Sequence, residues 1–220
     1  MKTKSILSLL TLASASSLFA VSGVRAACCA PEAPAARAPI AAATACCAEE
    51  KATAPLSARS IFQLDGSWND DSGATVQLAA LRGRPVILAM FFARCEYACP
   101  MLVSDIQRVR LSLPEAERSK VRVVLVSFDS ARDTSAALKA YRGQLELDAN
   151  WTLLRGEPGA VQELAMLLGV KFKPDANGQF SHSNLITLLN PEGEIVHQRA
   201  GLGGDVSTLT KAVTGLLKAK

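Results

Sequence analysis

The stretch VILAMFFARCEYACPMLVSDIQRVRLSL, residues 86–113, decides the fold. It opens with a continuous apolar run, VILAMFFA, of the kind that is typical of a fully buried strand. From Met101 onward, apolar residues recur at the spacing of one helix face. Pro100 follows the second of two cysteines, and proline is tolerated only in the first turn of a helix. The stretch therefore predicts a strand, a cysteine-bearing loop and a helix that begins near residues 97–100.

Strand and helix patterns continue to alternate on both sides of this stretch. Short strands are expected before it, within 60–70 and 73–81. The strands predicted after it cover 121–128, 151–154, 184–190 and 193–201, and the predicted helices cover 133–145, 157–169 and 204–218. This order predicts an α/β protein with a thioredoxin-like fold, in which a mostly parallel central sheet has helices on both faces and a C-terminal β-hairpin.

The first 26 residues, 1–26, have the layout of a secretory signal peptide. Lys2 and Lys4 precede an apolar run that is shorter than the roughly 20 residues of a membrane span. Small residues then surround a cleavage point near Ala26. We therefore expect cleavage, export to the periplasm and no membrane anchor. Lipid attachment at Cys28 is an alternative, which Arg25 disfavours.

Residues 27–56 are expected to form a disordered tail ahead of one domain at 57–220. The tail is dominated by Ala, Pro and Glu, and it offers almost nothing to bury. It carries two Cys-Cys pairs, formed by Cys28, Cys29, Cys46 and Cys47. Adjacent cysteines cannot form an unstrained disulfide with each other. These residues therefore either pair across the tail or serve as auxiliary ligands for a soft metal such as Cu(I).

The charge of the mature chain is nearly balanced. The chain has 24 basic and 20 acidic residues, and the signal peptide contains three of the basic ones, which leaves 21. The sequence shows no basic cluster interleaved with aromatic residues. We therefore expect no nucleic acid partner.

Cys95 and Cys99 form a CxxxC motif at the predicted helix start. Both thiols lie near the positive end of the helix dipole, which favours the thiolate. A thiolate can attack a disulfide or bind a metal, so this feature leaves both chemistries open. One helical turn separates the two sulfurs by about 6 Å along the axis, which is wide for a disulfide and readily bridged by a metal. A structural disulfide is the remaining alternative.

His182 is the candidate third ligand. It precedes the strand predicted at 184–190, on a loop that a thioredoxin-like sheet brings close to the cysteine-bearing helix start. Thioredoxins hold a cis-proline in that place, and Pro174 lies too far upstream to supply it. Two thiolates and one imidazole form a soft donor set that suits copper. The other histidine, His197, has charged neighbours on the hairpin and is interpreted as structural or solvated.

Four motifs follow one another along the predicted domain. They are CEYACP (95–100), VSFDSARDTSAALKAYR (126–142), WTLLRG (151–156) and FSHSNLITLLNPEGEIV (180–196). Together they resemble the Sco/SenC family of thioredoxin-like copper proteins. The resemblance runs from about residue 60 to residue 215, which is essentially the whole predicted domain.

The resemblance implies one copper ion, as Cu(I) or Cu(II), held by Cys95, Cys99 and His182, with Asp129 as the acidic residue close to the site. It also implies a metallochaperone rather than an enzyme, with a copper-accepting client such as subunit II of cytochrome c oxidase. We expect the protein to be a monomer. Two alternatives remain, namely a thiol–disulfide oxidoreductase that uses Cys95 and Cys99 as a redox pair, and an inactive thioredoxin-like scaffold.

Overall fold

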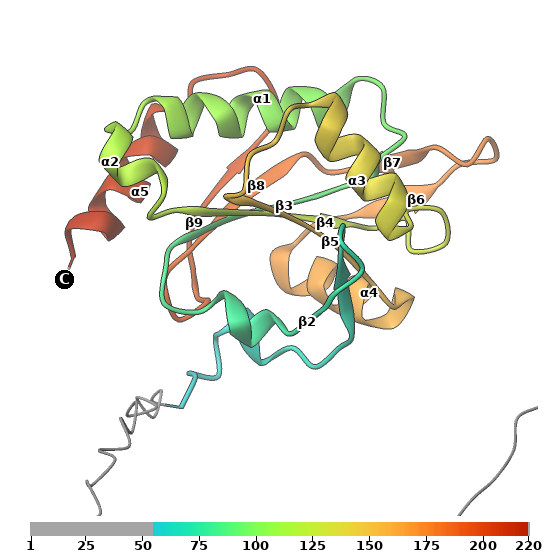
Figure 1. The fold of residues 1–220 in the computed structure, drawn as a ribbon, viewed down its shortest axis with the longest axis horizontal. Coiled ribbons are helices and arrows are strands. Elements are labelled where there is room, and N and C mark those ends of the chain that lie inside the picture. The colour runs from blue at the N-terminus through green and yellow to red at the C-terminus, as the bar shows by residue number, and fades with distance from the viewer. Residues whose placement is uncertain (1–54, 220) are drawn as a thin grey trace, which may run out of the picture. The chain divides into compact units, whose positions relative to one another are not determined.

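Strand β3 (Val86–Phe91) lies at the heart of the domain, and all six of its residues are buried. The structure, a computed structural model, describes residues 55–219 (Figure 1). In it, β3 pairs in parallel with β4 (Arg122–Ser127) and antiparallel with β8 (Leu185–Leu189). The apolar run that opens the deciding stretch is therefore the buried strand that it was expected to be.

The main sheet of the described chain has seven strands and is mixed. Its other members are β1 (Trp68–Asp70), β2 (Thr75–Val76), β5 (Trp151–Gly156) and β9 (Ile195–Ala200). The order across the sheet is β2-β1-β5-β4-β3-β8-β9. Only β3, β4 and β5 run parallel, since helical crossovers join them, and the other pairings are antiparallel. The prediction of a mostly parallel sheet is therefore wrong, because antiparallel pairs extend both edges of the parallel centre.

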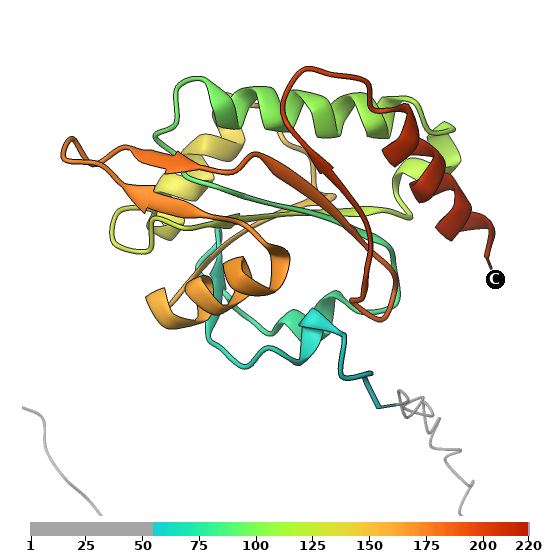
Figure 2. The same ribbon diagram turned by 180° about the vertical axis from the view of Figure 1, so that it is seen from behind.

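Helices cover both faces of this sheet, as predicted. Within residues 55–219 they are α1 (Ala98–Leu111), α2 (Glu115–Arg118), α3 (Ser135–Gln144), α4 (Pro158–Leu168) and α5 (Ser207–Lys218). α1 and α3 lie on one face, whereas α4 lies on the other face with the N-terminal segment (Figures 1 and 2). α5 packs against α1, β8 and β9. None of the helices in the described part of the chain is both long and apolar enough to cross a membrane.

The ends of these helices follow signals in the sequence. α1 begins at Ala98, so that Pro100 lies in its first turn. The side chain of Thr134 caps α3, and Pro158 occupies the first position of α4. Gly169 ends α4 with a positive φ of 74°, a conformation that glycine adopts without steric cost. The helix that follows the cysteines is therefore fixed in register by its own first turn.

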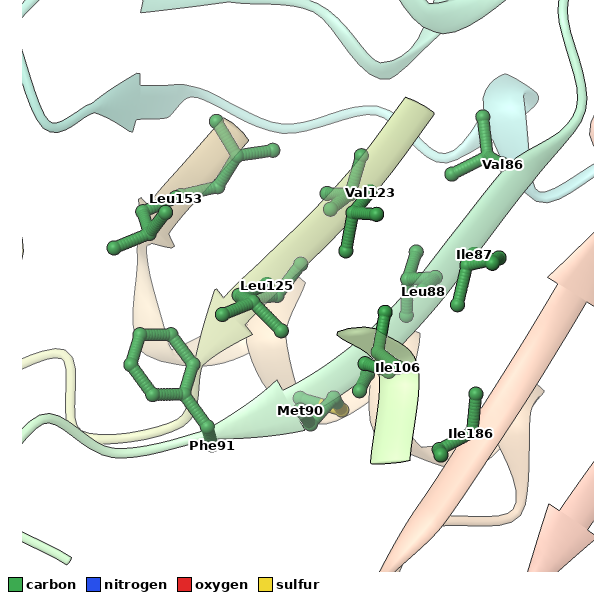
Figure 3. Packing of buried hydrophobic residues seen from close by; sticks show 14 of the residues in the cluster. Val86, Ile87, Leu88, Met90, Phe91, Ile106, Val123, Leu125, Leu153 and Ile186 are labelled. Atoms are coloured by element: carbon green, nitrogen blue, oxygen red, sulfur yellow. The ribbon is translucent and has the colours of Figure 1, made fainter. Parts of the chain in front are cut away.

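Aliphatic side chains from the central strands and α1 form the core. Figure 3 shows Leu88 and Met90 of β3 beside Ile106 of α1, with Leu125 of β4 on one side and Ile186 of β8 on the other. Each of these side chains is at most 2% exposed. Strands that are buried on both faces read as continuous apolar runs. This packing holds the carboxyl end of β3, where the cysteine loop begins.

Two segments differ from their predicted form. The region before β3 is only partly extended, since short 3-10 helices, η1 (Ile61–Gln63) and η2 (Leu78–Leu81), replace much of the expected strands. After α4, β6 (Phe172–Pro174) and β7 (Phe180–His182) form a separate antiparallel hairpin, in which Phe172 lies opposite His182. His182 therefore ends a strand, where a loop was predicted.

Candidate metal centre

Cys95 and Cys99 lie on either side of the start of α1. The backbone N–H of Cys95 donates to the carbonyl of Phe92 at 3.2 Å, which turns the chain after β3. Cys99 lies in the first turn of α1 and is buried, whereas Cys95 is half-buried. The backbone N–H of Cys99 donates to Sγ of Cys95 at 3.2 Å. An N–H group at the helix start therefore points at the Cys95 sulfur and favours its thiolate.

His182 reaches the two cysteines from the hairpin of β6 and β7. Its ring meets the ring of Phe92 edge-on, with centroids 5.9 Å apart, and its centroid lies 5.1 Å from that of Phe128. Nδ1 lies 3.2 Å from the carbonyl oxygen of Ser183. In the neutral tautomer that carries its proton on Nδ1, this carbonyl oxygen accepts from the ring and Nε2 can bind a metal.

The ligand atoms of Cys95, Cys99 and His182 all lie within 4.8 Å of one another. Metal bonds of about 2.3 Å to sulfur and about 2.0 Å to an imidazole nitrogen can reach three donors at this spacing. The donors are two sulfurs and one nitrogen, a set that favours soft metals over magnesium or calcium. The structure thus brings together the three residues that the sequence proposed as ligands.

The two thiols differ strongly in acidity. Hydrogen bonding to the Cys99 side chain is the largest cause that lowers the pKa of Cys95 from 9.0 to about 5. Partial burial opposes this shift, while the backbone N–H of Cys99 and the His182 ring reinforce it. The contact with Cys95 and then burial raise the pKa of Cys99. Near neutral pH the pair therefore carries one thiolate, on the more accessible Cys95.

Comparisons with known proteins extend this picture. Residues 57–218 match the family described as SCO1/SenC. The chain belongs to the SCO1/SenC family. A Stutzerimonas stutzeri protein named as a candidate copper-binding protein is 33% identical over 149 residues, which cover 66% of this chain and 71% of that protein. The SCO1 protein homolog of Bacillus subtilis (strain 168) is 25% identical over 140 residues, which cover 62% of this chain and 72% of the homolog.

Solved structures share the fold of this SCO1/SenC chain. ScoI of Arabidopsis thaliana, solved with copper bound, has a TM-score of 0.62 and 24% identity, covering 70% of this chain and 97% of that one. A SCO1/SenC family lipoprotein from Bacillus anthracis str. Ames has a TM-score of 0.64 and 19% identity, and the match covers 70% of this chain and 95% of the lipoprotein. The family match confirms the predicted family, and these structures confirm the predicted thioredoxin-like α/β fold.

A buried carboxylate supports the cysteine loop of this SCO1/SenC chain. Oδ2 of Asp133 accepts hydrogen bonds from the backbone N–H of Ala93 at 2.9 Å and from the hydroxyl of Ser127 at 2.5 Å. Burial is the main cause that raises the pKa of Asp133. The N-cap of α3 is Thr134 rather than Asp133. Asp133 instead joins the end of β4 to the loop that leads into Cys95.

Asp129, the acidic residue expected close to the site, contacts two arginines. Its Oδ2 lies 2.6 Å from Nε of Arg132 and 3.6 Å from Nη2 of Arg94. It is 3% exposed and does not belong to the group of three close donors. Asp129 is therefore a candidate for positioning rather than for ligation.

Several predicted residues lie elsewhere. His197 is on β9 opposite Leu188, and it is not part of the three-donor group. The tail cysteines Cys28, Cys29, Cys46 and Cys47 lie outside the described residues, as does the predicted signal peptide. The auxiliary role of the tail in metal binding therefore stays a prediction.

Proposed function

We propose that this SCO1/SenC protein is a copper chaperone that binds one copper ion, as Cu(I) or Cu(II), through Cys95, Cys99 and His182. The observation that carries the proposal is the convergence of two sulfurs and one imidazole nitrogen within 4.8 Å. Thiolates and imidazole are ligands that copper prefers. The copper-bound structures of Arabidopsis thaliana ScoI and yeast Sco1, which share this fold, support copper as the metal.

Burial gives this centre a direction for loading and release. Cys99 is buried, whereas Cys95 and His182 are half-buried. Ligands of a client protein would therefore approach the metal from the side of Cys95 and His182. Cys99 would be the last of the three residues to release the metal. Because Cys95 is already a thiolate near neutral pH, metal binding displaces a thiol proton only from Cys99.

The proposed client is an exported copper protein, with subunit II of cytochrome c oxidase as the leading candidate. One solved relative, BsSco, is described as a member of the Sco family of cytochrome c oxidase assembly proteins. The signal peptide predicted at 1–26 would deliver this chain to the periplasm, where we expect it to act as a monomer. The tail at 27–56 would collect Cu(I) for the domain, and unchanged copper uptake after its deletion would contradict that role.

A second candidate function is thiol–disulfide exchange, which the unequal acidity of the two cysteines favours. The Cys95 thiolate would attack a client disulfide, forming a mixed disulfide and releasing one client thiolate. Cys99 would then lose its proton and attack the Cys95 sulfur. That step forms a disulfide between the two cysteines and releases the second client thiolate, so the client gains two electrons and the protein loses two.

A copper titration tests the proposal. The chain with its four tail cysteines changed to serine is reduced and titrated with Cu(I) against a competing chelator, without oxygen. We expect one tightly bound copper, clearly weakened by His182→Ala. His197→Ala is the matched control, because it removes the other histidine of the sequence and should leave affinity unchanged. Absence of tight binding, or equal effects of the two substitutions, would refute the copper site, and disulfide reduction would then be the assay.

A further inference from the structure

The hairpin of β6 and β7 carries His182 but does not belong to the main sheet. It projects from the end of the domain (Figures 1 and 2). The rings of Phe172, which lies opposite His182, and of Phe180, which follows the turn, each lie 5.0 Å from the ring of Phe128. An isolated two-stranded hairpin is marginally stable in water. The position of His182 therefore depends on what holds the rest of the hairpin, which ends in the turn at 175–179.

Two arginines hold that turn. Nη2 of Arg94 donates to the carbonyl oxygen of Gly178 at 2.9 Å, and Nη2 of Arg132 donates to the same oxygen. The guanidinium of Arg132 also lies 5.6 Å from the centre of the Phe180 ring. Gly178 has a positive φ of 73°, and a Cβ at this position would lie 2.2 Å from Nη1 of Arg132. The turn thus fits the arginines only with glycine at 178.

Asp129 compensates the charge of these arginines. Two guanidinium groups that share one carbonyl repel each other. The carboxylate of Asp129 lies 2.6 Å from Nε of Arg132 and 3.6 Å from Nη2 of Arg94, and its side chain is 3% exposed. Removing the charge of Asp129 would leave Arg94 and Arg132, whose side chains are 46% and 35% exposed, without their shared carboxylate. We call Arg94, Asp129 and Arg132 the arginine cluster.

The arginine cluster connects the two sides of the metal centre. Arg94 directly precedes Cys95, and the turn that it binds leads into β7 and His182. We propose that Asp129 is a positioning residue, which acts through the two arginines to hold the hairpin so that His182 stays within reach of both sulfurs. The inference rests on the proposed copper function. It assigns Asp129 a role that needs no contact with the metal.

Double substitution separates positioning from a general effect on stability. Asp129→Asn keeps the shape of the side chain and removes its charge. It should lower Cu(I) affinity about 10-fold to 100-fold, the range found for residues that orient a metal ligand. In a His182→Ala background the same change should alter affinity less than about two-fold, because the residue that it positions is gone.

Two further variants test the same link. Gly178→Ala places a Cβ against Arg132 and should reproduce the affinity loss with Asp129 intact. Asp105→Asn is the matched control, since Asp105 is also buried and also contacts two arginines, Arg108 and Arg199. It should lower thermal stability without a comparable loss of Cu(I) affinity.

Hydrogen exchange of the metal-free protein tests the positioning role without copper. Asp129→Asn should speed exchange of the amides at 172–182 and leave β3 and β4 unchanged. Unchanged exchange at the hairpin would overturn the inference, and so would an affinity loss of equal size with and without His182. If the wild type takes up no copper but the hairpin still loosens in the variant, the copper function fails while the link from Asp129 to His182 stands.

Discussion

Replacing Cys99 by alanine should return Cys95 toward the acidity of an ordinary thiol. In the structure, hydrogen bonding to the Cys99 side chain is the largest cause that lowers the pKa of Cys95 from 9.0 to about 5. Cys99→Ala removes that partner but keeps the backbone N–H that lies 3.2 Å from Sγ of Cys95. The pKa of Cys95 should therefore rise in the variant, and the thiolate should form at higher pH.

The size of the effect follows from the fraction of thiolate. A thiol with a pKa of about 5 is about 90% ionised at pH 6 and fully ionised at pH 8, so its reaction rate is nearly the same at both. A thiol with a pKa of about 9 reacts about 90 times faster at pH 8 than at pH 6. The ratio of the two rates is the correct measure, because less acidic thiolates are intrinsically better nucleophiles and the rate at one pH mixes both effects.

The assay is alkylation of the reduced, metal-free protein by iodoacetamide, with peptide mapping to separate Cys95 from the tail cysteines. The wild type should give a rate ratio close to one. Cys99→Ala should give a ratio well above ten but below about 90, the value for a thiol with a pKa of about 9. Cys99 itself should stay unmodified in the wild type, because it is buried and its pKa is raised. A wild-type ratio above about ten, or equal ratios in both proteins, would refute the assigned acidity of the pair.

Other substitutions test the packing, each by denaturant unfolding. Phe128→Ala should lower the free energy of unfolding by about 3–5 kcal/mol, because this buried ring packs against Phe172 and Phe180 of the β6–β7 hairpin. Gly156→Ala should cost about 1–3 kcal/mol, since its Cβ would lie 2.7 Å from the ring of Trp68; Gly143→Ala, in open space on α3, should instead stabilise by about 0.5–1 kcal/mol. Asp105→Ala should cost about 3–5 kcal/mol by leaving the buried guanidinium of Arg199 without its carboxylate partner. A neutral Gly156→Ala or a destabilising Gly143→Ala would contradict this packing.

The parts of the site that the sequence predicted are those that local patterns determine. The apolar run before Cys95 and the proline after Cys99 define a strand and a helix start without any distant contact. His182 was found because the chain has only two histidines and one of them lies just before a buried strand. Order along the chain was therefore enough to identify the three residues whose ligand atoms the structure places within 4.8 Å.

The hairpin that carries His182 was missed, although its signal was present. Asn177 and Gly178 form a dipeptide that is typical of tight hairpin turns. The strands on either side have only three residues each, and Pro174 ends one of them. Short segments that contain proline are usually predicted to be loops. What makes them a hairpin is packing on Phe128, a contact that depends on the fold.

Local sequence patterns also could not predict the direction of β8 or the contacts of the arginine cluster, because both depend on the completed fold. An apolar strand looks alike whichever way it runs, so pairing with β3 decides that β8 is antiparallel. Arg94 and Gly178 are 84 positions apart, and Arg132 and Gly178 are 46 apart. Contacts of this kind follow from the completed fold. The sequence could therefore name Asp129 as a neighbour of the site without showing how it acts.

The proposed copper binding and the alternative disulfide exchange would use the same two sulfurs, those of Cys95 and Cys99. In the metal-free protein, the contact that makes Cys95 a thiolate also keeps Cys99 protonated, so the pair holds one ready nucleophile and one buried thiol. A copper ion at the proposed site would engage both sulfurs and remove them from exchange, whereas a disulfide between them would remove two of the three proposed ligands. In the oxidising compartment that the predicted export implies, the fraction of protein able to take up copper is therefore the fraction that still has both thiols reduced. Once Cys95 has formed a mixed disulfide with a client, burial of Cys99 would slow its attack on the Cys95 sulfur and its release of the client thiolate.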